Sequence, residues 1–119
     1  MGLSGAVVTQ GPGEATSVAG VIAAFEDAYY TRRDVEAAMR LLAPETGIAR
    51  DGLAAGIASI PAGTAHCVAI TPISTTAADV HVVQMSVDGQ RTDYLQVIDT
   101  RPVQPGASGV VISNIQRQG

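Results

Sequence analysis

The spacing of apolar residues changes once along this chain, near residue 64, and that change constrains the fold more than any other feature. Before it, apolar residues recur every three or four positions, which is the period of a helix with one buried face. After it, short runs rich in Val, Ile and Thr alternate with turn residues, as in β-strands. Helices that all precede an antiparallel sheet are typical of an α+β domain.

The first helical segment has the clearest apolar stripe. Thr16 or Ser17 is placed to cap its first turn. Five apolar residues then follow at helical spacing: Val18, Val21, Ile22, Phe25 and Tyr29. We expect this stripe to lie across the sheet, with Glu26 and Asp27 off its centre and Tyr30 on its flank.

Two shorter helices are expected next. The second helix begins after Thr31 or Asp34, either of which can cap it, and Pro44 ends it. The third helix is expected over residues 52–60, where Asp51 can act as the cap and a Pro-Ala-Gly turn follows.

Four strands are expected in the second half of the chain, over residues 64–73, 79–88, 91–99 and 109–117. The Asp88-Gly89 pair is a strong hairpin signal between the second and third of them. Short turns between successive strands favour antiparallel neighbours. We therefore predict N-terminal helices packed on a curved antiparallel four-stranded sheet.

The domain is expected to span residues 15–119, because 119 residues suffice for one core. Residues 1–14 contain Gly11-Pro12-Gly13 and have the composition of a linker, which suggests a piece of a larger protein. No stretch reaches the roughly 20 apolar residues of a membrane span, so no transmembrane segment is predicted.

Charge and cysteine content exclude several classes of function. The net charge is −4 and all seven basic residues are scattered arginines, so we predict no nucleic-acid binding. Cys67 is the single cysteine and lies in an apolar run, where a buried thiol is the expected state. No cofactor is predicted.

Three stretches of the helical part form a recognisable series: residues 21–29 (VIAAFEDAY), 34–36 (DVE) and 41–44 (LLAP). Together they resemble the opening of nuclear transport factor two-like domains, a cystatin-like α+β superfamily. The resemblance covers roughly residues 15–117. It implies a cone in which a curved sheet wraps around the first helix, often with a pocket at the open end. Ketosteroid isomerases, polyketide cyclases and many non-catalytic modules share this superfamily.

A weaker resemblance lies in residues 60–68 (IPAGTAHCV). With the helical start, this stretch is similar to a small domain of actinobacterial proteins that lies outside the cytoplasmic membrane, after a membrane anchor. The resemblance implies an extracytoplasmic location.

The first resemblance also implies which residues line a pocket and which carry chemistry. We expect five pocket-lining residues: Phe25, Tyr29, Met39, Met85 and Tyr94. The position that matches the tyrosine donor of the superfamily's isomerases is Phe25, which cannot donate a hydrogen bond to an oxyanion. Asp51 falls near the place of the superfamily's catalytic base, but it is also well placed as a helix cap, and the cap is the role that we expect.

The two histidines, His66 and His81, are the remaining catalytic candidates. His66 shares a strand face with Val68, and His81 shares one with Val83 and Met85, so alternation points both toward the apolar side. Either becomes an acid–base candidate if it lines a cavity. Two histidines without a supporting carboxylate make a poor metal site, so no metal is predicted.

The sequence leaves two functions open. The first is a non-catalytic module that binds a small apolar ligand or a partner protein, with a homodimer formed through a second sheet face that carries Val80, Val82 and Ile98. The alternative is a small isomerase, cyclase or hydrolase with a pocket between the first helix and the sheet. The missing oxyanion donor favours the binding module.

Overall fold

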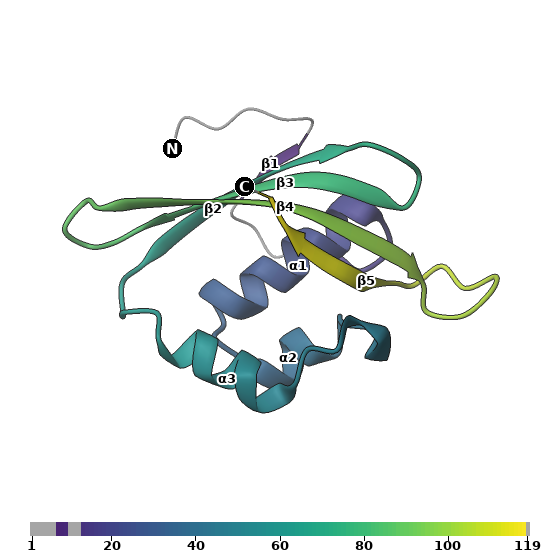
Figure 1. Cartoon of the computed structure of the whole chain (residues 1–119), viewed down its shortest axis with the longest axis horizontal. Coiled ribbons are helices and arrows are strands. Elements are labelled where there is room, and N and C mark those ends of the chain that lie inside the picture. The colour runs from purple at the N-terminus through teal and green to yellow at the C-terminus, as the bar shows by residue number, and fades with distance from the viewer. Residues whose placement is uncertain (1–6, 10–12, 119) are drawn as a thin grey trace.

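The computed structural model describes residues 7–9 and 13–118, which form three α-helices, one 3-10 turn and five strands (Figure 1). The strands are β1 (Val7–Thr9), β2 (Ala65–Pro72), β3 (Ala77–Met85), β4 (Arg91–Pro102) and β5 (Val110–Arg117). The helices are α1 (Val18–Tyr30), α2 (Val35–Met39), η1 (Pro44–Thr46) and α3 (Arg50–Ala58). The predicted α+β class is confirmed. None of the described helices is long and apolar enough to cross a membrane.

The sheet is an antiparallel meander in the order β1-β2-β3-β4-β5. Helix α1 crosses one face of it, and α2 and α3 lie on the far side of α1 (Figure 1). The four predicted strands are β2 to β5. The hairpin at Asp88-Gly89 is confirmed: Gly89 adopts a φ of 88°, and the Ser86 hydroxyl bonds the Asp88 carboxylate.

Strand β1 departs from the expectation of a linker over residues 1–14. Val7 pairs with Ile70 and Thr9 with Val68, so these residues extend the sheet beyond β2. A strand of three residues is too short to show a periodic pattern, which is why the sequence did not indicate it. The rest of the expected linker up to residue 12 lies outside the described residues.

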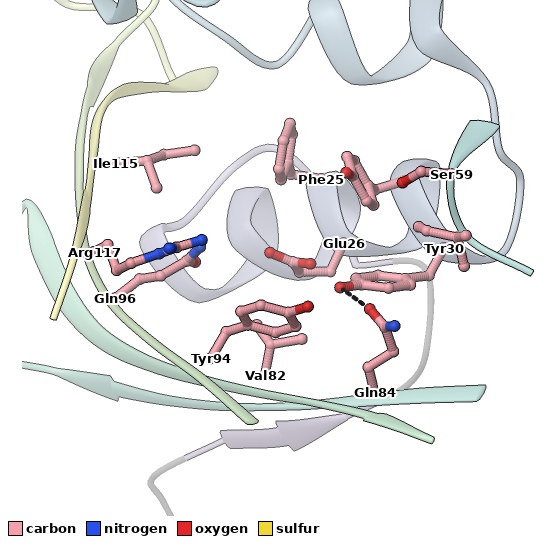
Figure 2. A pocket seen from close by; sticks show the side chains of 12 residues that line it. Phe25, Glu26, Tyr30, Ser59, Val82, Gln84, Tyr94, Gln96, Ile115 and Arg117 are labelled. Carbon is pink, nitrogen blue, oxygen red and sulfur yellow. Dashed lines mark hydrogen bonds between the residues drawn. The ribbon is translucent and has the colours of Figure 1, made fainter. Parts of the chain in front are cut away.

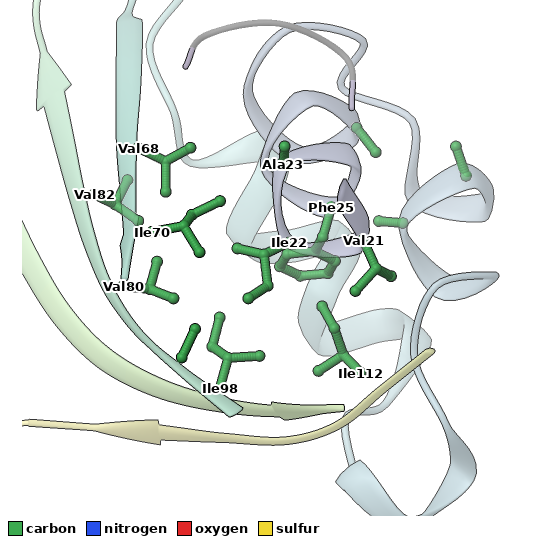
Figure 3. Close-up of a cluster of buried hydrophobic side chains, with 14 of the residues drawn as sticks. Val21, Ile22, Ala23, Phe25, Val68, Ile70, Val80, Val82, Ile98 and Ile112 are labelled. Carbon is green, nitrogen blue, oxygen red and sulfur yellow. The ribbon is translucent and has the colours of Figure 1, made fainter. Parts of the chain in front are cut away.

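The core is aliphatic and lies between α1 and the sheet. Ser17, one of the two predicted caps, caps α1 by accepting a hydrogen bond from the Gly20 amide at 2.9 Å. The largest fully buried side chains of this core are Ile and Val, as Figure 3 shows: Val21, Ile22, Val68, Ile70, Val80, Val82, Ile98 and Ile112.

The face assigned to β3 from the sequence was wrong. Val80, Val82 and Ile98 were placed on a second face available for dimerisation, but they are buried in the cluster beneath α1 (Figure 3). His81 and Met85 lie on the opposite face. The error arose because β3 carries apolar residues on both faces, so alternation alone does not show which face the helix covers.

Side-chain contacts hold α3 beside the other two helices. Arg33 donates from Nη2 to the Ile57 carbonyl at 3.1 Å, and the Arg50 guanidinium bonds the Glu36 carboxylate. Ser59 and Ile60, which directly follow α3, line one hollow together with residues of β3, β4 and β5.

Candidate functional site

A cavity of about 370 Å³ opens between α1, the end of α3 and strands β3 to β5 (Figure 2). Its volume is within the range of small-molecule sites. Its walls combine apolar side chains with carboxyl, hydroxyl, amide and guanidinium groups: Phe25, Glu26, Tyr29, Tyr30, Ser59, Ile60, Val82, Gln84, Tyr94, Gln96, Ile115 and Arg117.

Every aromatic side chain of this chain lines that one cavity. The sequence holds one Phe, three Tyr and no Trp, and all four are in the wall. The ring centroids of Phe25 and Tyr29 lie 6.2 Å apart, and those of Tyr29 and Tyr30 lie 5.1 Å apart. Phe25 also belongs to the core cluster, whose other buried members are Val, Ile, Leu and Ala, so the aromatic residues are concentrated where the core borders the cavity.

Glu26 is the most unusual residue of the cavity. It is only 5% exposed, and Figure 2 shows its carboxyl group among Phe25, Tyr30 and Tyr94. No hydrogen bond or ion pair to this carboxyl group occurs among the described residues. Burial raises the pKa of Glu26 to about 8, so the group is mainly a neutral acid at pH 7.

The other polar groups of the cavity are partly satisfied. Tyr30 donates its hydroxyl to Gln84 Oε1 at 3.1 Å. Burial, and secondarily the charge of Glu26, raise the pKa values of Tyr29 and Tyr30, so both hydroxyls keep their protons at neutral pH. Gln96 Oε1 is buried and has no partner within the described chain. The cavity therefore contains acceptors that a ligand could satisfy.

His66 lies on the other side of Tyr30, beside a second hollow of about 450 Å³ formed by the α1–α2 and α3–β2 connections. Its ring stacks on Tyr30 with centroids 5.0 Å apart, and its Nε2 is buried without a partner in the described chain. Burial lowers the pKa of His66, while the nearby charge of Asp27 acts in the opposite direction. The sequence placed His66 on the inner face, and the structure agrees.

His81 lies on the outer face of the sheet, where it lines a third hollow of about 300 Å³ and neither of the two hollows described above. Its Nε2 is 2.6 Å from Asp93 Oδ2, and Arg91 Nε is 2.8 Å from Asp93 Oδ1. These partners, Arg91 first, hold the pKa of Asp93 at about 2. The expected inward orientation of His81 is therefore wrong, for the same reason as the face of β3.

Asp51 neither caps α3 nor lines the cavity. The N-cap is Ala49, which provides no side-chain hydrogen bond, and Asp51 is exposed in the first helical turn. There the positive end of the helix dipole stabilises the negative charge of a carboxylate. The helix starts at Arg50, two residues before the expected start at residue 52, which moves Asp51 out of the cap position.

The structure brings together three of the five predicted pocket residues: Phe25, Tyr29 and Tyr94. Met39 instead packs against the core from α2, and Met85 is half-buried at the end of β3 on the outer face. Glu26 was missed as a site residue. A signal was present, because Glu26 is four residues after Ile22 and follows Phe25 directly, so an acid lies within the helix's apolar surface.

Within the described residues, no three His, Cys, Asp or Glu side chains come together as metal ligands. The fold and site define the class of this protein: an α+β domain with an aromatic, acid-containing cavity under its sheet. The chain belongs to the family described as "Domain of unknown function (DUF8176)", whose model matches residues 3–116. No curated protein and no solved structure gives a significant match.

Proposed function

We propose that this domain is a small-ligand-binding module whose ligand occupies the cavity between α1 and the sheet, within a cone of the nuclear transport factor two-like type. The observation that carries the proposal is Glu26, a buried acid without a hydrogen-bond partner in the described chain, surrounded by the four aromatic residues. An unsatisfied buried polar group is costly, and a ligand that satisfies it recovers that cost.

The arrangement of elements supports the likeness to the superfamily. Helices come first, a meander sheet follows, and α1 lies against the sheet's inner face (Figure 1). The extracytoplasmic location and the homodimer stay predictions. The outer sheet face carries the His81–Asp93–Arg91 cluster in place of the valines first assigned to it.

An NMR fragment screen on the full chain would test the proposal. We expect amide shifts from small, amphipathic fragments to cluster at residues of α1, β3 and β4 that line the cavity. Ser59→Trp places a large side chain at the exposed rim of the cavity and should abolish these shifts. Ser74→Trp, in the exposed β2–β3 turn, is the matched control and should preserve them. Shifts that avoid the cavity, or that survive in Ser59→Trp, would refute the proposal.

Glu26 also favours a second candidate, a small enzyme of the isomerase, cyclase or hydrolase type. A carboxyl group with a pKa of about 8 can both donate and accept a proton near neutral pH. If the module is an enzyme of this kind, a bound fragment with an acidic C–H bond should exchange that hydrogen in D₂O with wild type and not with Glu26→Gln. Binding of the fragment without hydrogen exchange would exclude this enzyme and support the non-catalytic module.

A further inference from the structure

We propose that the ligand of this cavity is a small organic cation, an ammonium group with apolar substituents, held between Glu26 and the surrounding aromatic rings. This inference rests on the proposed function, since it names the ligand class of the same cavity.

The aromatic rings supply the first half of the argument. Figure 2 shows the rings of Phe25, Tyr30 and Tyr94 on different sides of the Glu26 carboxyl group. Tyr29 completes the set from the same helix. The face of an aromatic ring attracts a cation, and several rings around one point are the usual means of recognising alkylated ammonium groups. Neutral apolar ligands need no such concentration of rings, because aliphatic walls serve them equally well.

The unpaired acid supplies the second half. An ionised carboxylate at the position of Glu26 is unfavourable because the side chain is buried and no positive group of the described chain pairs with it, so the folded domain favours its protonated form. An ammonium group beside it would stabilise the carboxylate and restore its charge. A neutral or anionic ligand would leave this penalty in place.

The other titratable groups around Glu26 do not supply the missing positive charge. The side chains of Tyr29 and Tyr30 on α1 and of Tyr94 on β4 are phenols, which cannot carry a positive charge. Arg117 lines the cavity from the end of β5, but it is exposed and makes no ion pair with Glu26 among the described residues. Ser59, Gln84 and Gln96 complete the polar wall without charge.

Choline and 3,3-dimethyl-1-butanol form a matched pair of probes, since they share shape and hydroxyl group and differ in the charged nitrogen. Titration of the full chain by NMR should show choline binding at least about ten-fold more tightly than the alcohol. Choline carries a charge that does not titrate, so any dependence on pH belongs to the protein.

Binding a cation to ionised Glu26 releases the proton that the empty domain holds. We therefore expect choline affinity to rise by at least about ten-fold from pH 6 to pH 8. Burial lowers the pKa of His66 from its ordinary value of 6.5, so the change in affinity above pH 6.5 is the part that reports on Glu26. The substitution Glu26→Gln should remove both the pH dependence of choline binding and most of the affinity for choline. Asp27→Asn, which neutralises the adjacent buried acid outside the cavity wall, is the matched control and should retain both.

Three results would overturn the proposal that the ligand is an organic cation. They are equal or tighter binding of the neutral alcohol, preferential binding of the anionic analogue 3,3-dimethylbutanoate, or failure of choline to shift the cavity amides while neutral fragments do. In each of these the cavity remains a ligand site and only its ligand class changes. If no fragment of any charge binds there, the proposed function fails as well.

Discussion

Glu26 shows at the scale of one residue how a position on a helix decides the chemistry of a side chain. Its neighbours along the α1 surface, Ile22 and Phe25, are buried, so the acid is buried with them. The helix period could be predicted from the sequence. The sequence does not show whether the flank of the apolar stripe faces solvent, core or cavity, because that depends on where β4 and β5 lie.

Glu26 should make folding stability fall as pH rises. The unfolded chain has the ordinary pKa of 4.5 and the folded state about 8, so between these values the folded state holds a proton that the unfolded state lacks. Urea unfolding from about pH 6.5 to about pH 8 should show a loss approaching ~1.4 kcal/mol per pH unit.

The variant Glu26→Gln has no proton to lose and should flatten this dependence. Measurements start near pH 6.5 because His66, with a lowered pKa, gives the opposite slope below its ordinary value of 6.5. A wild-type curve already flat between pH 6.5 and pH 8 would show that Glu26 is ionised in the folded domain.

His66→Phe should stabilise the domain. The phenyl ring retains the stacking on Tyr30 and removes the buried Nε2, which has no partner in the described chain. An unsatisfied buried group costs on the order of 1–3 kcal/mol, so chemical unfolding should show a gain of about 1 kcal/mol. His81→Phe is the control, since His81 is partly exposed and bonded to Asp93, and it should give no gain. A loss of stability in His66→Phe would mean that the imidazole makes a contact the phenyl ring cannot replace.

At the scale of elements, helices and long strands could be predicted because each has one consistent period. The start of α1 at Ser17 and the hairpin at Gly89 follow from local chemistry. The failures have equally physical causes. Strand β1 is too short for a pattern, and β3 is apolar on both sides, so His81 and Val82 were each predicted on the wrong face.

The two glycines of α3 should respond differently to alanine. A Cβ at Gly52 meets nothing within 4 Å, whereas a Cβ at Gly56 would lie 2.5 Å from the Tyr29 hydroxyl. Gly52→Ala should therefore add about 0.5–1 kcal/mol of helix stability. Gly56→Ala should lose most of that gain and weaken choline binding several-fold, because Tyr29 must move in the cavity wall. Equal behaviour of the two variants in unfolding and titration would show that Tyr29 is not held by α3.

At the scale of the whole molecule, two kinds of side chain divide the space beneath the sheet. Aliphatic residues make up most of the core around Ile22 and Ile98, and the aromatic residues surround the cavity, with Phe25 at the boundary between the two. A domain that needed only a packed interior would gain by placing its large rings in the core, where they bury the most area. This division is what assigns stability to one region and ligand binding to the other.

Strand β4 allows that division to be tested on a single strand, because Tyr94 and Ile98 are four residues apart on the same face. Ile98 is fully buried, so Ile98→Ala should lower the free energy of unfolding by about 2–5 kcal/mol and leave the choline affinity unchanged. Tyr94→Leu removes a ring from the cavity wall while keeping an apolar side chain. It should weaken choline binding several-fold and change stability by less than about 1 kcal/mol. Urea unfolding and NMR titration of both variants separate the two effects. If Tyr94→Leu costs as much stability as Ile98→Ala, the aromatic wall is part of the core and the division does not hold.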